Sequence, residues 1–287
     1  MRVLVTGAGG MLGHDVVTLA EGAVHDVVAL THADLDITDA AAVDRVFASV
    51  RPNAVINCAA WTDVDGAEQH EQEATAVNGE GARNLAAAAA RLEAMVVYPS
   101  TDYVFNGRSP EPYRETDETD PLSAYGRSKL AGEAATMEAN PRHFVVRTSW
   151  IFGPHGKNFV ETMLGLGRER GQVLVVRDQV GCPTYTGHLA AGLVRLIDAT
   201  AYGIHHMAGQ GACSWYEFAQ EIFRQAGIDC EVLSATTEMV PRPAPRPAHA
   251  VLLSMRETPI RLPPWQRGLG EYLKRRPAAA EAGQAMQ

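Results

Sequence analysis

Short apolar runs alternate with stretches of helical spacing along the first half of the chain. The apolar runs predict five strands, at Val3–Thr6, Val27–Leu30, Ala54–Asn57, Met95–Ser100 and Phe144–Thr148. The stretches between them predict helices from the first glycines to Leu19 and over Ala41–Val50, Glu73–Ala90 and Ser123–Glu138. Near-continuous apolar strands separated by helices are typical of a parallel sheet that is covered on both faces. The pattern therefore predicts an α/β fold with a doubly wound, Rossmann-type sheet.

The rhythm changes after about Trp150. Helices are predicted at Phe159–Arg170, Gly187–Ile197 and Trp215–Ala226, separated by irregular segments such as Arg177–Thr186. The proline-rich segment Pro241–Pro247 is incompatible with a helix interior or a central strand. We expect a nucleotide-binding domain over 1–150, the remaining strands and a smaller C-terminal substrate-binding lobe over 151–276, and a flexible tail over 277–287.

Composition and charge narrow the classes of function. The 287 residues are 46% hydrophobic and carry a net charge of −9, which argues against a dedicated nucleic-acid binder. The four cysteines stand singly, as in proteins with reduced thiols. No apolar run approaches the ~20 residues of a membrane span, and the N-terminal run is too short for a signal peptide. We expect a soluble, cytoplasmic protein without nucleic-acid or membrane partners.

A glycine-rich turn joins the first predicted strand to the first helix. Its spacing is G-x-x-G-x-x-G, with Gly7, Gly10 and Gly13 at the three glycine positions and Met11-Leu12 between the last two. Gly7 allows a tight turn, Gly10 lets a pyrophosphate approach the backbone, and Gly13 allows close packing of the helix. Phosphates would then bind to free N–H groups at the helix N-terminus. The turn predicts a bound dinucleotide.

The end of the second strand bears on which dinucleotide is bound. The strand ends in Leu30-Thr31-His32 and lacks the carboxylate that would accept hydrogen bonds from a ribose 2′-hydroxyl. This favours NADPH, with His32 near its extra phosphate, although NADH stays possible because no Arg stands there. Asp36-Ile37 are the best-placed partners for the adenine amine, whereas Asp34 is equally consistent with a role in a solvated turn.

Tyr125 and Lys129 are four residues apart in a predicted helix and therefore share one face. A phenol titrates near ~10, so it needs a neighbouring ammonium to work as an acid or base at neutral pH. Lys129 can supply that charge and also hold the nicotinamide ribose. Thr101, at the end of the fourth strand, can donate a hydrogen bond to a substrate carbonyl oxygen. Together these residues predict carbonyl chemistry on a nicotinamide cofactor.

With these motifs in place, the sequence resembles the extended short-chain dehydrogenase/reductase family, whose members act mainly on nucleotide sugars. The resemblance runs from Met1 to about Leu273. Besides the glycine turn, it rests on segments that are similar to those of the family's dTDP-sugar reductases, namely Asn57–Thr62, Ser100–Gly107, Tyr125–Glu133, Arg147–Trp150 and Asp178–Thr184. It implies transfer of a hydride from NAD(P)H to the C4 ketone of a dTDP-linked 6-deoxy sugar. No residue identifies the thymine base.

The resemblance also implies roles for individual residues. Tyr125 would be the general acid, Lys129 would tune it and anchor the ribose, and Thr101 would polarise the carbonyl. The cofactor would be lined by Gly10, Met11, Leu12, Asp36, Ile37, Ala60, Trp61 and Thr62. The sugar would contact Thr101, Asp102 and Trp150, and Arg246 is a candidate partner of the diphosphate, although Ala250 stands where the family often has Ser.

A dimer bridged by a metal ion occurs in some members of the family, and Asp15 could be one ligand. The later helix begins Thr186-Gly187-His188 and lacks the Glu that such a bridge would use. We therefore expect no structural metal, and a monomer or a homodimer.

Three alternatives stay open. A 4,6-dehydratase would need a second carboxylate directly after Asp102, where Tyr103 stands. An epimerase would regenerate its cofactor within each turnover. A non-catalytic protein, similar to the regulatory subunit of methionine adenosyltransferase, would bind ligands without turnover, and the intact Thr101, Tyr125 and Lys129 argue against it.

Overall fold

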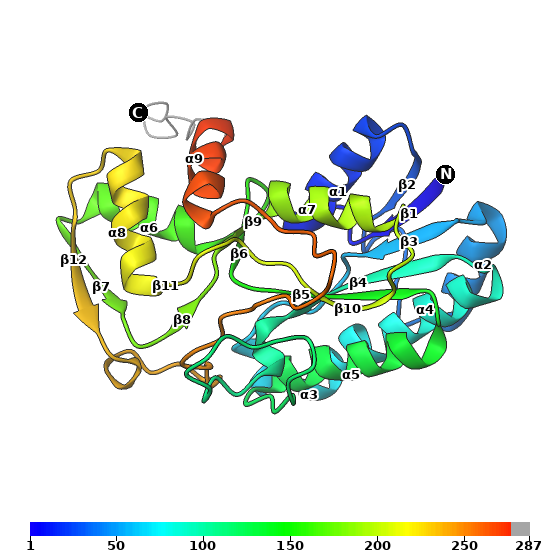
Figure 1. Cartoon of the computed structure of the whole chain (residues 1–287), viewed down its shortest axis with the longest axis horizontal. Coiled ribbons are helices and arrows are strands. Elements are labelled where there is room, and N and C mark those ends of the chain that lie inside the picture. Colours follow the sequence, from blue (N-terminus) through cyan, green and yellow to red (C-terminus); the bar gives the residue numbers. More distant parts are fainter. Residues whose placement is uncertain (277–287) are drawn as a thin grey trace, which may run out of the picture.

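A six-stranded parallel sheet forms the centre of the molecule, in a computed structural model that describes residues 1–276 (Figure 1). The strand order is β10-β5-β4-β3-β1-β2. The strands are β1 (Arg2–Thr6), β2 (Asp26–Leu30), β3 (Ala54–Asn57), β4 (Met95–Thr101), β5 (His143–Thr148) and β10 (Gly203–His206). The predicted α/β fold class is confirmed, and the first five strands lie within a residue of their predicted bounds.

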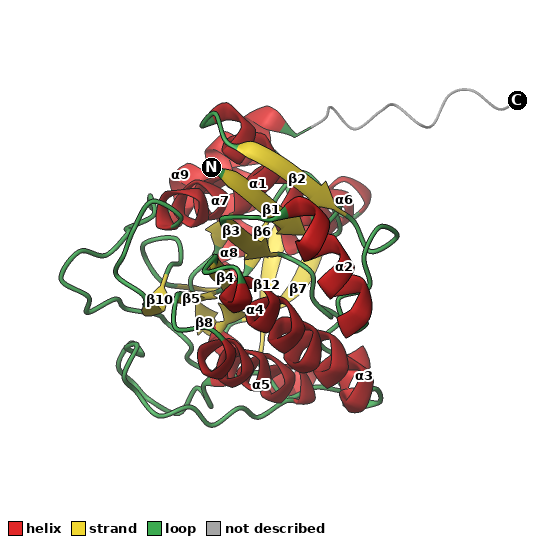
Figure 2. Ribbon diagram, turned by 90° about the vertical axis from the view of Figure 1, so that its right-hand side faces the viewer, coloured by secondary structure: helices red, strands yellow, loops and turns green. Residues whose placement is uncertain are grey.

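Helices cover both faces of the sheet (Figures 1 and 2). One face carries α1 (Met11–Gly22) and α7 (Thr186–Leu196). The other carries α2 (Ala40–Val50), α4 (Ala82–Arg91) and α5 (Ala124–Ala139). Successive residues of β1 serve the two cores in turn, since Val3 and Val5 pack in the α1/α7 core and Leu4 packs in the α2/α4 core. This two-sided burial is why the strands are apolar at almost every position.

The second half of the chain adds strand β10 to this sheet and helix α7 to the layer that covers it. It also forms a lobe of its own. The lobe lies beyond the carboxyl ends of the central strands in Figure 1 and has a separate aromatic core around Phe152, Phe218 and Trp265. Its main elements are α6 (Phe159–Glu169), β7 (Gln172–Val176), α8 (Trp215–Ala226), β12 (Glu231–Ala235) and α9 (Trp265–Arg275). Strands β7 and β12 pair in parallel.

The expectation of a wholly irregular segment over Arg177–Thr186 is wrong. It contains β8 (Val180–Gly181) and β9 (Thr184–Tyr185), which pair with β11 (Cys213–Ser214) and β6 (Ile151–Phe152). Two-residue strands are too short to leave a hydrophobic period in the sequence. Pro241–Pro247 contains no helix or strand, as predicted.

The single helix predicted over Glu73–Ala90 is interrupted. It consists of α3 (Glu71–Thr75), a π-helical turn η2 (Ala76–Gly81) and α4. The π-turn places Asn78 in the interior, where its side chain makes hydrogen bonds with Trp61 and Ser128. Tertiary hydrogen bonds thus set the backbone here, and helical periodicity alone does not reveal them. The short 3-10 helices are η1 (Gly66–Glu68), η3 (Asp102–Val104) and η4 (Thr237–Met239).

The sequence analysis also made predictions about the C-terminal tail and about membrane-spanning segments. The expected flexible tail, 277–287, lies outside the described residues. Within residues 1–276, no helix combines the length and the apolar character needed to cross a membrane.

Candidate active site

The carboxyl ends of the central strands surround a cavity of about 430 Å³. From β1 the chain continues to β2 on one side of the sheet and then crosses to β3 on the other, so ligands are expected at the ends of β1 and β3. Ten of the predicted site residues line the cavity: Gly10, Met11, Leu12, Ala60, Thr62, Thr101, Asp102, Tyr125, Lys129 and Trp150. The structure thus brings both predicted halves of the site, cofactor and catalytic, to one place.

The glycine turn is shaped by two close approaches. Gly7 has φ +64°, and a Cβ there would lie 2.5 Å from the backbone of Cys58 and Ala59. A Cβ on Gly13 would lie 2.2 Å from the carbonyl oxygen of Gly7, so the third glycine permits the first turn of α1 to fold against the loop itself. Gly7 and Gly13 therefore shape the turn without lining the cavity.

The N-terminus of α1 is open to an anion. Its N-cap, Gly10, offers no side chain to the first N–H groups, and the first turn holds no acidic residue. Helix N-termini with free N–H groups and a favourable dipole bind phosphate. The residues present therefore fit a dinucleotide pyrophosphate, with Gly10, Met11 and Leu12 facing it from the cavity wall.

Helix α5 presents its functional side chains to the end of β4. Ser123 caps the helix by accepting a hydrogen bond from the Gly126 N–H at 3.1 Å. A Cβ on Gly126 would lie 2.3 Å from the carbonyl oxygen of Tyr103, so this glycine lets the first turn of α5 pack against η3. Tyr125 is thereby brought to Thr101, as the sequence predicts.

Lys129 is buried one turn further along α5. Its Nζ donates a hydrogen bond to the carbonyl oxygen of Pro99 at 2.8 Å and lies 4.1 Å from the centre of the Tyr98 ring. Burial lowers the pKa of Lys129 to about 7, although the nearby Glu133 carboxylate opposes the change. Glu133 in turn forms a fully buried ion pair with Arg147, with Nη2 and Oε2 2.7 Å apart.

Tyr125 itself is kept protonated by its surroundings. Burial raises the pKa of Tyr125 well above its usual value, and the charge of Asp102 raises it further. We expected Lys129 to lower this pKa, but its Nζ is bound to Pro99, and Lys129 is not among the groups that affect the Tyr125 pKa. A protonated phenol is the form that can donate a proton to a developing alkoxide.

Asp102 is a buried carboxyl next to Tyr125, only 1% exposed. It accepts hydrogen bonds from the hydroxyls of Thr101 at 3.0 Å and Ser149 at 3.1 Å. Burial raises the pKa of Asp102 to about 7, and these two hydrogen bonds partly oppose that change. The Thr101 hydroxyl, which also accepts from the Tyr103 N–H, is therefore held in place by its neighbours.

Two stacked indole rings form part of the cavity wall. Trp150 follows the end of β5 with φ +46°, a left-handed conformation that is uncommon for a bulky residue. Its ring stacks on Trp215 of α8 with centroids 3.6 Å apart and planes 7° apart. Trp150 thus joins the sheet to the lobe, and both rings line the cavity.

A second cavity of about 280 Å³ adjoins the first and shares Tyr103 and Trp215 with it. Apolar residues of α6 and β7 form part of its lining, together with the guanidinium groups of Arg242 and Arg246. Arg246 Nη1 lies 2.6 Å from Asp65 Oδ1, and its side chain is 14% exposed. Arg246, the predicted partner of the substrate diphosphate, therefore lines this second cavity and forms an ion pair with Asp65.

The segment Ala60–Thr62 is fixed by the π-turn. Asn78 accepts a hydrogen bond from the Trp61 N–H at 2.9 Å and donates one to the Trp61 carbonyl at 3.1 Å. The indole of Trp61 packs with Ala67, Ala74 and Ala124. Ala60 and Thr62 line the cavity, whereas Trp61 is not among its lining residues.

The residues predicted for the adenosine end lie beyond the cavity lining. Asp34 accepts hydrogen bonds from the Thr31 N–H and hydroxyl, which lower the pKa of Asp34. Asp36 is exposed and accepts from the N–H and hydroxyl of Thr38. Ile37 is buried, and His32 is exposed just after β2. These hydrogen bonds support the interpretation of Asp34 as a residue of a solvated turn.

Sequence reasoning missed several residues of the site, among them Trp215, Lys157 and Asn78. Trp215 and Lys157 line the cavity, and Asn78 supports it from behind. The capping box of Ser214 and Glu217 could have placed Trp215 at the start of a helix. It does not indicate that the Trp215 ring lines a cavity. Lys157 lies in a loop, where no motif marks it as a site residue. Asn78 lies in a segment with the periodicity of a helix, and that periodicity does not distinguish it from its neighbours.

Comparison with known proteins places this geometry in a family. The family described as "RmlD substrate binding domain" matches residues 1–277. The chain belongs to that family. It is 42% identical over 282 residues to the "Spore coat polysaccharide biosynthesis protein SpsK" of Bacillus subtilis, covering 98% of this chain and 99% of the relative.

Two solved structures are similar to it over almost their whole length. A dTDP-4-dehydrorhamnose reductase from Clostridium acetobutylicum has a TM-score of 0.93 and 45% identity, and covers 96% of this chain and 99% of its own. The dTDP-4-dehydrorhamnose reductase of Bacillus anthracis, solved in complex with NADP, has a TM-score of 0.93 and 39% identity, with 95% and 98% covered.

Proposed function

We propose that this protein is an NADPH-dependent reductase of a dTDP-linked 4-keto sugar. The substrate would be dTDP-4-dehydro-6-deoxy-L-mannose and the product dTDP-L-rhamnose. The observation that carries the proposal is the protonated, buried Tyr125 beside Thr101 and Lys129, at the end of a sheet with an open glycine turn. Membership of the RmlD family and similarity to dTDP-4-dehydrorhamnose reductases support it.

The chain's own groups divide the chemistry between them. When bound, the reduced nicotinamide supplies a hydride to C4 of the sugar. Thr101 would turn its hydroxyl from Asp102 to the C4 carbonyl oxygen and polarise it, and the Tyr125 phenol would give its proton to that oxygen as negative charge develops on it. Lys129, whose pKa burial lowers to about 7, would bind the ribose hydroxyls of the cofactor. Trp150 packs against the sugar.

The two cavities match the two parts of a nucleotide sugar. The sugar would bind in the first cavity, below the stacked indoles, and the nucleotide in the second, where Arg246 and Arg242 face the diphosphate. Residues 1–150 would hold the cofactor, and the lobe within 151–276 would hold the substrate. A substrate and cofactor of this kind are metabolites of the cytoplasm, where we place the protein.

The test is turnover of the proposed substrate by the purified chain. We expect one NADPH to be oxidised for each dTDP-L-rhamnose formed, with NADH as the comparison cofactor. The sugar would be generated in place by upstream enzymes, and the product identified by mass. Tight NADPH binding without oxidation would refute reduction, and an isomeric keto sugar formed without net NADPH use would indicate an epimerase.

A further inference from the structure

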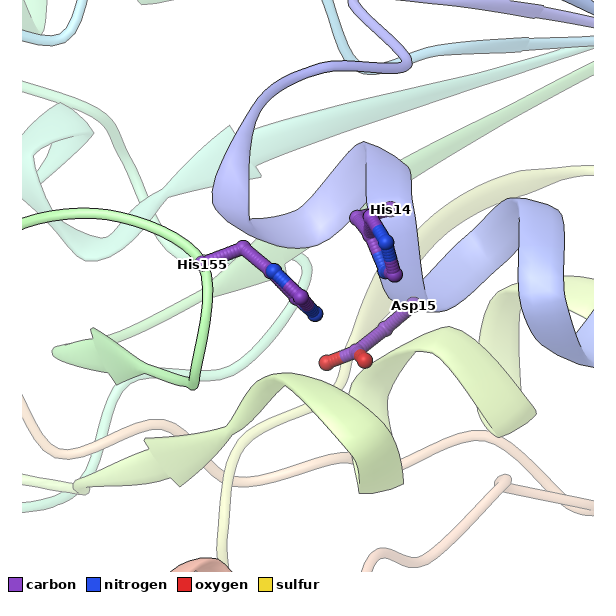
Figure 3. Close-up of side chains that lie close together, drawn as sticks. All are labelled: His14, Asp15 and His155. Atoms are coloured by element: carbon purple, nitrogen blue, oxygen red, sulfur yellow. The ribbon is translucent and has the colours of Figure 1, made fainter. Parts of the chain in front are cut away.

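Three potential metal ligands meet near the start of α1 (Figure 3). His14 and Asp15 are neighbours on that helix, and His155 comes from the loop 153–158 between β6 and α6. The ligand atoms of the three side chains all lie within 4.8 Å of one another. The imidazole rings of His14 and His155 are stacked, with centroids 3.5 Å apart and planes 25° apart. These residues are not among those that line either cavity described above.

One oxygen of this cluster lacks a partner. Asp15 Oδ2 is buried, and no hydrogen-bond donor within the described chain reaches it. A buried carboxylate oxygen without a partner is costly, and charged groups cost more than neutral ones. A cation between Asp15 and the two imidazoles would satisfy this oxygen once one ring has turned out of the stack, because an imidazole binds a metal ion in the plane of its ring.

The donor set indicates which cation would bind. Imidazole nitrogen suits zinc and its transition-metal neighbours, whereas magnesium and calcium prefer ligand sets made of oxygen alone. Two His and one carboxylate are a known zinc set that leaves a fourth position for water. We propose that His14, Asp15 and His155 bind one divalent transition-metal ion of the zinc class within a single chain.

The ion would join two elements that border the active site. His14 and Asp15 follow the glycine turn, and His155 lies two residues before Lys157, which lines the cavity. Next to it, Gly156 has φ +123°, and a Cβ there would lie 3.6 Å from Met11 Cε. The bound ion would therefore fasten the loop 153–158 to the cofactor end of α1. The proposal departs from the expectation of no structural metal, because His155 is far from His14 in the sequence.

Metal binding can be measured without cofactor or sugar, so its outcome is independent of the proposed reductase activity. Chelator-treated protein without an affinity tag would be titrated with Co²⁺, followed by its visible absorption, and then with Zn²⁺ in competition. We expect one ion per chain. His14→Ala and His155→Ala should each weaken binding by at least about tenfold, because even the loss of a residue that only orients a ligand costs that much.

Two variants serve as controls. His25→Ala removes a histidine outside the cluster, and His188→Ala removes one that pairs with Glu271 at 2.9 Å; both should bind the ion as the natural protein does. Zn²⁺ should also raise the unfolding temperature of the natural protein but not of His155→Ala, whose change lies in a loop and spares the helices. Absence of stoichiometric binding, or binding lost in His188→Ala and kept in His155→Ala, would overturn the proposal.

Discussion

Burial is the main reason why the pKa values of Tyr125 and Asp102 are both raised inside the cavity, and the charge of Asp102 raises that of Tyr125 further. Tyr125 therefore holds its proton, and the pKa of Asp102 is raised to about 7. The Y-x-x-x-K spacing identified Tyr125 and Lys129, but the charge states follow from burial, which depends on residues distant in the sequence. At the scale of single residues, the sequence therefore predicts which residues form the site better than it predicts their pKa values.

Removing the Tyr125 hydroxyl should abolish turnover and leave cofactor binding intact. We expect Tyr125→Phe to lose activity by about 10²-fold or more, because it removes the general acid. The matched variant Tyr113→Phe loses a phenol that donates to Asn106 at 2.9 Å, away from the cavity, and should stay active. Steady-state rates and NADPH titration by fluorescence would check this. Full activity in Tyr125→Phe would remove this residue from the mechanism.

Asp102 should make the stability of the fold depend on pH. Its pKa is about 7 in the folded protein, against an ordinary value of 3.8. Between these values the folded chain holds a proton that the unfolded chain has lost, so this group lowers the free energy of unfolding as pH rises through the window. Relative to the natural protein, Asp102→Asn should therefore gain stability from pH ~4 to ~7, by on the order of a few kcal/mol.

Denaturant unfolding at several pH values would measure that gain. Asp198→Asn, which changes an exposed carboxylate, is the control and should show a constant difference from the natural protein. An equally constant difference for Asp102→Asn would mean that Asp102 is ionised in the folded state throughout this range.

At the scale of elements, helix α1 and its glycine turn were predicted correctly, and the helical segment over 73–90 was predicted without the π-turn that divides it. The turn is local, so spacing reveals it. The π-turn depends on Asn78 bonding to Trp61 and Ser128, which lie elsewhere in the chain. The positive φ of Trp150 and its stacking on Trp215 are likewise products of tertiary packing. Local signals set most elements here, and long-range contacts set the exceptions.

Two glycines of α1 offer a matched test of the turn. A Cβ on Gly13 would lie 2.2 Å from the Gly7 carbonyl oxygen, whereas a Cβ on Gly22 would meet no atom within 4 Å. Gly13→Ala should lower the free energy of unfolding by about 1–3 kcal/mol through overpacking and weaken NADPH binding. Gly22→Ala should be neutral or stabilising by up to ~1 kcal/mol. Equal effects of the two changes on binding would refute the role of the turn.

At the scale of the whole molecule, the site lies where the sheet and the lobe meet. Asp65, which follows β3, accepts hydrogen bonds from Arg246, Arg242 and the N–H of Ala244 in the proline-rich segment. The hydrogen bond from Arg246 is the main reason why the pKa of Asp65 is low. The sequence predicts a nucleotide-binding domain and a substrate-binding lobe, but not this ionic connection between them.

Arg246→Ala should impair the use of the sugar nucleotide and spare the cofactor. Hydrogen bonds to charged groups contribute about 1.5–3 kcal/mol, so we expect KM for the sugar nucleotide to rise roughly tenfold to a hundredfold. The Kd for NADPH should be unchanged. Arg83→Ala, which removes an exposed ion pair with Glu138, should change neither constant. A loss of NADPH affinity in Arg246→Ala would contradict its placement at the substrate.

The most direct test of the central claim follows the hydride itself. NADPH with both hydrogens of the reactive nicotinamide carbon replaced by deuterium would be incubated with the protein and dTDP-4-dehydro-6-deoxy-L-mannose. We predict dTDP-L-rhamnose with one deuterium at C4 of the sugar and one NADP formed per product, with both formed at least about 10²-fold more slowly by Tyr125→Phe. A product without deuterium at C4, or no product although NADPH binds, would contradict the account.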